Sequence, residues 1–167
     1  IQVVEGSGQW AHSAMSTLAP TVSNGVVSAQ LSVGLDGTGR WVNAVPGEGD
    51  ERLMLKGHDV VAYFTQGRHA LGSGQFKSTH EGVSFRFASA EHKALFDANP
   101  AKYLPQYGGF CANGIVYGIP WGGDADTWRI DNGKLYIFGG KGSKDAFELD
   151  VAGNTALADK YWREEIA

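Results

Sequence analysis

Alternating hydrophobic and polar residues predict a hairpin near the middle of the chain. Val83, Phe85 and Phe87 occupy every second position after the turn at residues 80–82, and residues 75–79 precede that turn. Because successive side chains of a strand point to opposite faces, this spacing predicts two paired strands with one buried face. Residues 41–43 are predicted to form another short strand. The apolar segments 53–55 and 60–64 predict short strands or buried extended pieces.

A second hairpin is predicted around Asn132-Gly133, which separates residues 127–131 from residues 134–138. Asparagine followed by glycine supplies the positive φ angles that a two-residue hairpin turn needs. The side chains that this hairpin would place on one face are Trp128, Ile130, Leu135 and Ile137.

Helices are predicted between and after these strands. Ser89 is a candidate N-cap for a helix that ends near Asn99-Pro100 or continues by another turn through Tyr103. Ser143 and residues 154–155 are candidate caps of two C-terminal helices. Short antiparallel strands and hairpins packed with a few helices predict a single compact domain of the α+β class.

The first third of the chain has a different composition from the rest. Residues 6–35 carry no formal charge, residues 10–18 favour a short helix, and residues 26–33 alternate only in part. Glycines and a proline follow in a turn-rich connection. We therefore expect an uncharged, turn-rich N-terminal extension over residues 1–51 and a folded domain over residues 52–167.

Charge and hydropathy exclude two classes of partner. The 167 residues include 14 basic and 18 acidic side chains, for a net charge of -4, and the basic residues form no run. A nucleic-acid partner is therefore not expected. No apolar stretch approaches the roughly 18 residues that a membrane span needs. The chain has a single cysteine, so no intramolecular disulfide can form.

Several short motifs between residues 52 and 166 resemble those of YHS-domain proteins, particularly the small exported ones. Residues 57–64, Gly-His-Asp-Val-Val-Ala-Tyr-Phe, are similar to the family segment Gly-Tyr-Asp-Pro-Val-Ala-Tyr-Phe. The other matching segments, in the family's order and spacing, are residues 87–91, 99–103, 106–112 and 128–136.

The resemblance implies a compact α+β unit exported to the bacterial periplasm or secreted. Relatives that keep a pair of cysteines are associated with metal, notably copper. In related TRASH-like domains the turn after the strand reads Phe-Cys-Ser-x-x-Cys, whereas this chain has Ala88 and His92 at the cysteine positions. A methyl group cannot bind a metal, but imidazole suits copper or zinc.

Each candidate residue also has an ordinary structural interpretation. His92 falls on the helix face of Leu95 and Phe96, where it is either a metal ligand or a partly buried, hydrogen-bonded histidine. Cys111 is either an inert buried side chain, a soft metal ligand, or a thiol that a histidine would activate. Asp59 is a ligand, a general base or a turn residue that accepts bonds from neighbouring amides.

Two weaker patterns do not support a site. Residues 139–143 do not match the spacing of a phosphate-binding loop. The sequence Asp124-Ala125-Asp126 lacks the remaining ligands and the central glycine of an EF-hand loop.

The leading hypothesis is a non-enzymatic binding module of the cell envelope, with a small molecule or a metal ion held in one pocket. The Asp59 turn, residues 88–92 and the Cys111 loop would surround that pocket. Alternatives are a thiol-dependent enzyme or redox protein, or an interaction domain that covers a partner or a second copy of itself. The candidate ligand-binding residues are Asp59, Tyr63, Cys111 and Trp128, and the candidate ligands for copper or zinc are His58, His92 and Cys111.

Overall fold

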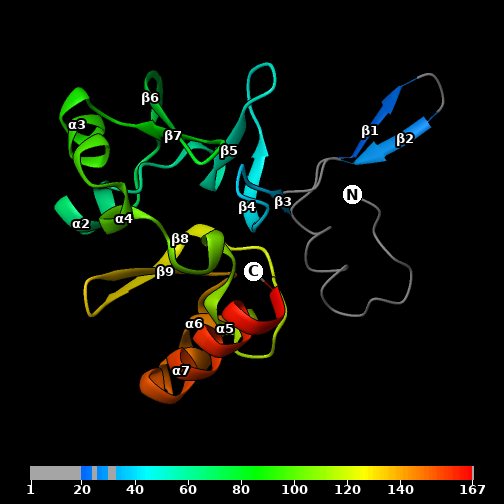
Figure 1. Ribbon diagram of the computed structural model, residues 1–167, viewed down its shortest axis with the longest axis vertical. Coiled ribbons are helices and arrows are strands. Elements are labelled where there is room, and N and C mark those ends of the chain that lie inside the picture. Colours follow the sequence, from blue (N-terminus) through cyan, green and yellow to red (C-terminus); the bar gives the residue numbers. More distant parts are fainter. Residues whose placement is uncertain (1–19, 24–25, 30–32, 167) are drawn as a thin grey trace.

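The computed structural model describes residues 20–23, 26–29 and 33–166 (Figure 1). The helix predicted over residues 10–18 lies outside the described residues. Strands β1 (Pro20–Ser23) and β2 (Val26–Ala29) pair with each other as an antiparallel ribbon.

A five-stranded sheet forms the first half of the described chain. Its order is β3 (Val33–Leu35), β4 (Trp41–Pro46), β5 (Arg52–Met54), β7 (Val83–Phe87) and β6 (Ser73–His80). The strand over residues 41–43 and the β6–β7 hairpin are thus confirmed. Strand β4 pairs with β5, so the boundary expected at residue 52 falls between two hydrogen-bonded strands of one sheet. Strands β5 and β7 run parallel, whereas the other neighbours are antiparallel.

The prediction of an extended segment over residues 60–64 is wrong, because this part contains the helical turn α2 (Ala62–Thr65). The carboxylate of Asp59 accepts hydrogen bonds from the N–H groups of Val61 and Ala62, at 2.8 and 3.2 Å. A carboxylate that accepts such bonds stabilises the start of a helical turn. This local capping outweighs the strand preference of the two valines.

Helix α3 (Ala90–Ala98) begins as predicted. The Ser89 hydroxyl accepts a hydrogen bond from the N–H of His92 at 3.1 Å, and Glu91 lies in the first turn. Pro100 then opens a further helical turn, α4 (Pro100–Tyr103). The short helices η2 (Gln106–Gly109) and α5 (Ala112–Ile115) follow.

The second predicted hairpin is confirmed as β8 (Asp124–Asp131) and β9 (Lys134–Phe138). Asn132 and Gly133 have φ angles of 51° and 76°, as the turn type requires. The predicted C-terminal caps are wrong: Ser143 lies inside α6 (Lys141–Glu148), and α7 (Val151–Tyr161) starts earlier than residue 154. Asp150 caps α7 instead, because its carboxylate accepts the N–H of Gly153 at 3.0 Å.

Strand β9 joins two hydrophobic clusters. Leu135 and Ile137 belong to the cluster that includes the five-stranded sheet, whereas Tyr136 and Phe138 belong to the cluster beneath the C-terminal helices. Figure 1 shows the hairpin between the sheet and helices α5, α6 and α7. After α7, a single π-helical segment, η3 (Trp162–Ile166), ends the described chain. The α+β class is confirmed, and the described part of the chain contains no helix that could cross a bilayer.

Candidate functional site

Asp59 is a fully buried carboxylate, and both of its oxygens accept hydrogen bonds. One oxygen, Oδ1, accepts the N–H groups that start α2, and the other, Oδ2, accepts the N–H of Ala88 at 2.9 Å. Oδ2 also lies 2.6 Å from Nδ1 of His92. Two of the three turns that the sequence analysis grouped together, at residue 59 and at residues 88–92, therefore meet through this carboxylate.

His92 uses both of its ring nitrogens within this network. Nδ1 faces Asp59, and Nε2 lies 3.0 Å from the hydroxyl of Thr65. The Thr65 hydroxyl also donates to the carbonyl of Val61 at 3.3 Å. Carboxylate, imidazole and hydroxyl thus follow the order found in hydrolase triads. However, the Thr65 hydroxyl bonds back to its own helical turn, so the arrangement favours a structural role that fixes α2 against α3.

Cys111 lies apart from this network. Its side chain is fully buried in the cluster beneath the C-terminal helices, and its backbone pairs with Ile137 of β9. Its N–H donates to the carbonyl of Trp121 at 2.9 Å. The prediction of a single pocket between the three turns is therefore wrong, because the Cys111 loop packs into a different part of the interior.

These residues do not fit a preformed copper or zinc site. Within the described residues, no three His, Cys, Asp or Glu side chains gather as metal ligands. His92 has both nitrogens engaged, and Nδ1 of His58 lies 2.9 Å from the carbonyl of Leu55. His58, His92 and Cys111 consequently do not form the shared metal centre that the family resemblance implies.

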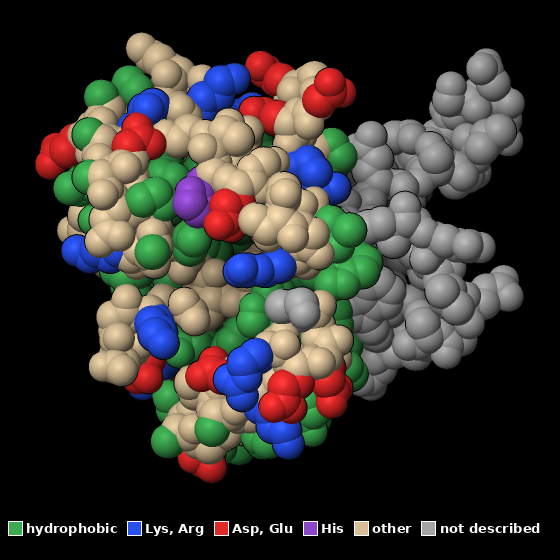
Figure 2. Space-filling view, viewed as in Figure 1, with side chains coloured by type: hydrophobic (Ala, Val, Ile, Leu, Met, Phe, Trp, Pro, Cys, Tyr) green, Lys and Arg blue, Asp and Glu red, His purple; other side chains and the backbone are tan. Residues whose placement is uncertain are grey.

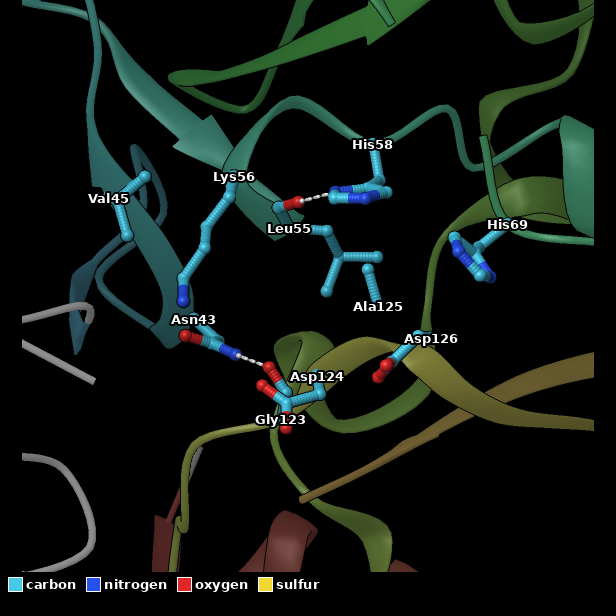
Figure 3. A pocket seen from close by; sticks show the side chains of 10 residues that line it. All are labelled: Asn43, Val45, Leu55, Lys56, His58, His69, Gly123, Asp124, Ala125 and Asp126. Atoms are coloured by element: carbon cyan, nitrogen blue, oxygen red, sulfur yellow. Dashed lines mark hydrogen bonds between the residues drawn. The ribbon is translucent and has the colours of Figure 1, made fainter. Parts of the chain in front are cut away.

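The structure instead contains a polar cleft of about 370 Å³ beside the His58 turn. One wall comes from β4 and the segment after β5, and the other comes from the start of β8. Figure 3 shows Asp126 at the same end of the cleft as His69, while Lys56 reaches toward Asn43. The lining residues are Asn43, Val45, Leu55, Lys56, His58, His69, Gly123, Asp124, Ala125 and Asp126.

A left-handed turn forms one wall of the polar cleft. In η1 (Leu55–Gly57), the three successive residues have φ angles of 51°, 55° and 86°. The N–H of His58 closes the turn by donating to the carbonyl of Leu55 at 3.1 Å. Leucine and lysine are unfavourable in this conformation, which only glycine adopts without steric penalty. The turn is therefore strained, and it directs Lys56 into the cleft (Figure 3).

Two buried polar side chains hold the opposite wall. The amide of Asn43 donates to the carbonyl of Gly109 at 3.0 Å and approaches that of Gly123 at 3.5 Å. The hydroxyl of Tyr63 donates to the carbonyl of Ala125 at 2.5 Å. Burial, with the carboxylates of Asp126 and Asp59, raises the pKa of Tyr63, so the hydroxyl remains a donor. The backbone on both sides of Asp124 is thus fixed from the protein interior.

The cleft carries charges of both signs. Burial and then the neighbouring Asp126 carboxylate raise the pKa of Asp124, whereas the Lys56 ammonium lowers it. Because a carbonyl oxygen only accepts, Nδ1 of His58 donates to Leu55. The lining residues of the cleft thus include two carboxylates and one lysine ammonium.

Of the six candidate residues taken from the sequence, only His58 lines the polar cleft. Tyr63 and Trp128 pack against each other, with ring centroids 5.0 Å apart, and support the cleft wall from behind. Sequence reasoning missed Asn43, Lys56 and His69 as contributors. The one signal of the cleft in the sequence is the pair Asp124 and Asp126, which does not match a calcium loop.

A second hollow has a different character. This groove of about 430 Å³ has an apolar floor that includes Trp41, Phe85 and Tyr107, and Trp162 lies along it. Figure 2 shows hydrophobic side chains recessed between the upper part of the molecule and the lower part. Its rim combines acidic and basic side chains, so it offers no single complementary charge.

Comparison with protein families, with curated proteins and with solved structures finds no match to this chain. The YHS resemblance therefore stays a prediction that depends on the short motifs.

Proposed function

We propose that this protein is a non-enzymatic binding module that holds a small polar molecule in the polar cleft. The observation that carries the proposal is the cleft itself, in which charged side chains of both signs stand on two walls, and Asn43 and Tyr63 fix the wall that carries the aspartates. Binding sites typically combine a preformed concave surface with a few convergent polar groups. A position in the bacterial cell envelope, as in the exported YHS proteins, is part of the same proposal.

The alternative of a thiol-dependent enzyme has less support. A nucleophilic cysteine needs access to its substrate and a base beside its sulfur. Cys111 is 0% exposed and packs among apolar side chains. Its geometry favours the interpretation as an inert part of the interior.

The proposal predicts that blocking the cleft abolishes binding. A ligand-observed NMR screen of small polar molecules should give hits with the native protein and none with Val45→Trp, whose indole would project from β4 into the cleft. Leu149→Trp is the matched control, because Leu149 is 87% exposed and does not line the cleft. His69→Trp blocks the cleft from an exposed loop and serves if Val45→Trp does not fold.

Three outcomes would contradict the proposal. Hits that persist in both blocked variants would place the binding site elsewhere. A screen without hits would remove the function. Stoichiometric uptake of Cu²⁺ or Zn²⁺ that His92→Ala abolishes, without any small-molecule hit, would favour the metal-binding hypothesis instead.

A further inference from the structure

Opposite charges enter the polar cleft without pairing with each other. Lys56 comes from the strained turn, and Asp124 and Asp126 come from the first residues of β8. Asp126 accepts one long bond, at 3.3 Å, from the adjacent Thr127 hydroxyl. Among the ion pairs of the described residues, none joins Lys56 to either aspartate. Lys56 lies near enough to Asp124 to lower its pKa, but no direct ion pair occupies either group. Each charge can therefore contact a ligand group of the opposite sign.

The two kinds of charge also have different surroundings. Asp126 lies at the end of the cleft where His58 and His69 face each other, with ring centroids 6.0 Å apart. An ammonium group has three donors, and carboxylate oxygens supply matching acceptors. Lys56 reaches to the other end of the cleft, where it is the cation that a ligand carboxylate would meet. Asp124 lies between these ends: Figure 3 shows it beside Gly123, near Asn43, and the Lys56 ammonium lowers its pKa. The cleft thus has Asp126 and two histidines at one end and a cation at the other.

The backbone of Lys56 gives an independent reason to assign it a role. Lys56 has an unfavourable φ angle of 55°, which glycine would adopt without penalty. Within the described residues the lysine ammonium forms no hydrogen bond that would offset this strain. A strained residue whose side chain adds nothing to packing, and which projects into a cleft, is typical of a binding role.

From these observations we infer that the cleft recognises a small zwitterion of the amino-acid class. The ligand's ammonium group is held by Asp124 and Asp126, and its carboxylate is held by Lys56. The volume of about 370 Å³ leaves room for such a molecule, since it equals roughly a dozen water-sized groups. This inference rests on the proposed function, because it names the ligand class of the same site.

The test compares ligands that differ only in charge. Glycine, β-alanine, γ-aminobutyrate and 5-aminovalerate span increasing separations between ammonium and carboxylate, and each has a matching amine and a matching acid. Calorimetric titration at low salt should show one member of the series binding about threefold more tightly than its own amine or acid. Each of these comparisons removes one ion pair, and an exposed ion pair typically contributes a few-fold.

Variants assign the two charges separately. Lys56→Met should reduce the affinity for the preferred amino acid to that of the matching amine, and the double variant Asp124→Asn, Asp126→Asn should reduce it to that of the matching acid. The controls Lys134→Met and Asp50→Asn remove exposed charges outside the cleft and should leave every affinity unchanged.

The possible failures distinguish the inference from the proposed function. If no member of the series binds, or if amine and amino acid bind equally well, the zwitterion inference is wrong, whereas the function is still judged by the wider screen and the blocked variants. Preference for the amino acid that survives Lys56→Met would also overturn it. If no ligand binds in this series or in the screen, both the zwitterion inference and the proposed function are wrong.

Discussion

At the scale of single residues, the buried Asp59 carboxylate organises the first half of the molecule. It accepts bonds from the start of α2, from Ala88 after β7, and from His92 on α3. The partners come from three separate parts of the chain, and three of the four bonds come from backbone N–H groups. A buried charge is tolerated when it is satisfied in this way.

Asp59→Asn should therefore destabilise the protein strongly while keeping nearly the same shape. An amide presents one N–H₂ group where the carboxylate presents an acceptor, so at least one donor loses its partner. We expect the free energy of unfolding to fall by about 3 kcal/mol, measured by urea denaturation. The exposed control Asp50→Asn should change it by less than about 0.5 kcal/mol. Equal stability of Asp59→Asn and the native protein would contradict the structural role of this carboxylate.

At the scale of elements, the turn η1 shows how local strain positions a side chain. Three successive left-handed residues, Leu55, Lys56 and Gly57, reverse the chain between β5 and His58. The neighbouring packing holds the turn in place, because Leu55 is buried in the larger hydrophobic cluster. A side chain at residue 56 thus faces the cleft whatever its chemical type.

Comparison of two substitutions at one position separates strain from side-chain function. Lys56→Gly should be more stable than Lys56→Ala by about 1 kcal/mol, because alanine keeps the left-handed penalty and glycine does not. Thermal unfolding measured by circular dichroism provides the comparison. Lys134→Gly and Lys134→Ala form the control pair, because Lys134 has no positive φ angle. At this position the glycine variant should not be more stable than the alanine variant. An alanine variant as stable as the glycine variant would show that the turn relaxes.

At the scale of the whole molecule, β9 makes the two hydrophobic clusters depend on each other. Its alternate side chains fill both clusters, and its backbone pairs with β8 and also forms parallel bridges at Pro105 and Cys111. Neither cluster can be dissolved without exposing one face of this strand. We therefore expect the described domain to unfold in a single cooperative step.

Two truncations on opposite faces of β9 test this coupling. Ile137→Ala and Phe138→Ala should each lower the free energy of unfolding by about 3 kcal/mol, because both side chains are fully buried. Tryptophan fluorescence and the accessibility of the Cys111 thiol should report the same urea midpoint in each variant. Leu149→Ala, at an exposed position, is the control. Two separate midpoints would show that the clusters unfold independently.

The parts of this molecule that could be predicted from sequence are those determined by neighbouring residues. The Asn132-Gly133 turn and the Ser89 cap are local, so their patterns were sufficient. The α2 turn was missed because the carboxylate of Asp59 outweighs the strand preference of the residues after it. The cleft was missed for a different reason: its walls come from residues near 43, 56, 69 and 124, which no motif connects and only the tertiary fold brings together.

The position of β9 also limits how this protein can be divided. A cut in the loop before β8 would leave β9, which contributes to both hydrophobic clusters, in the C-terminal fragment. The five-stranded sheet would remain in the N-terminal fragment with one face uncovered. Neither piece would bury its apolar surface alone, and each would expose a complementary face to the other. Coexpressed halves should consequently reassemble rather than fold apart, which makes this loop a natural choice for a split-reporter design.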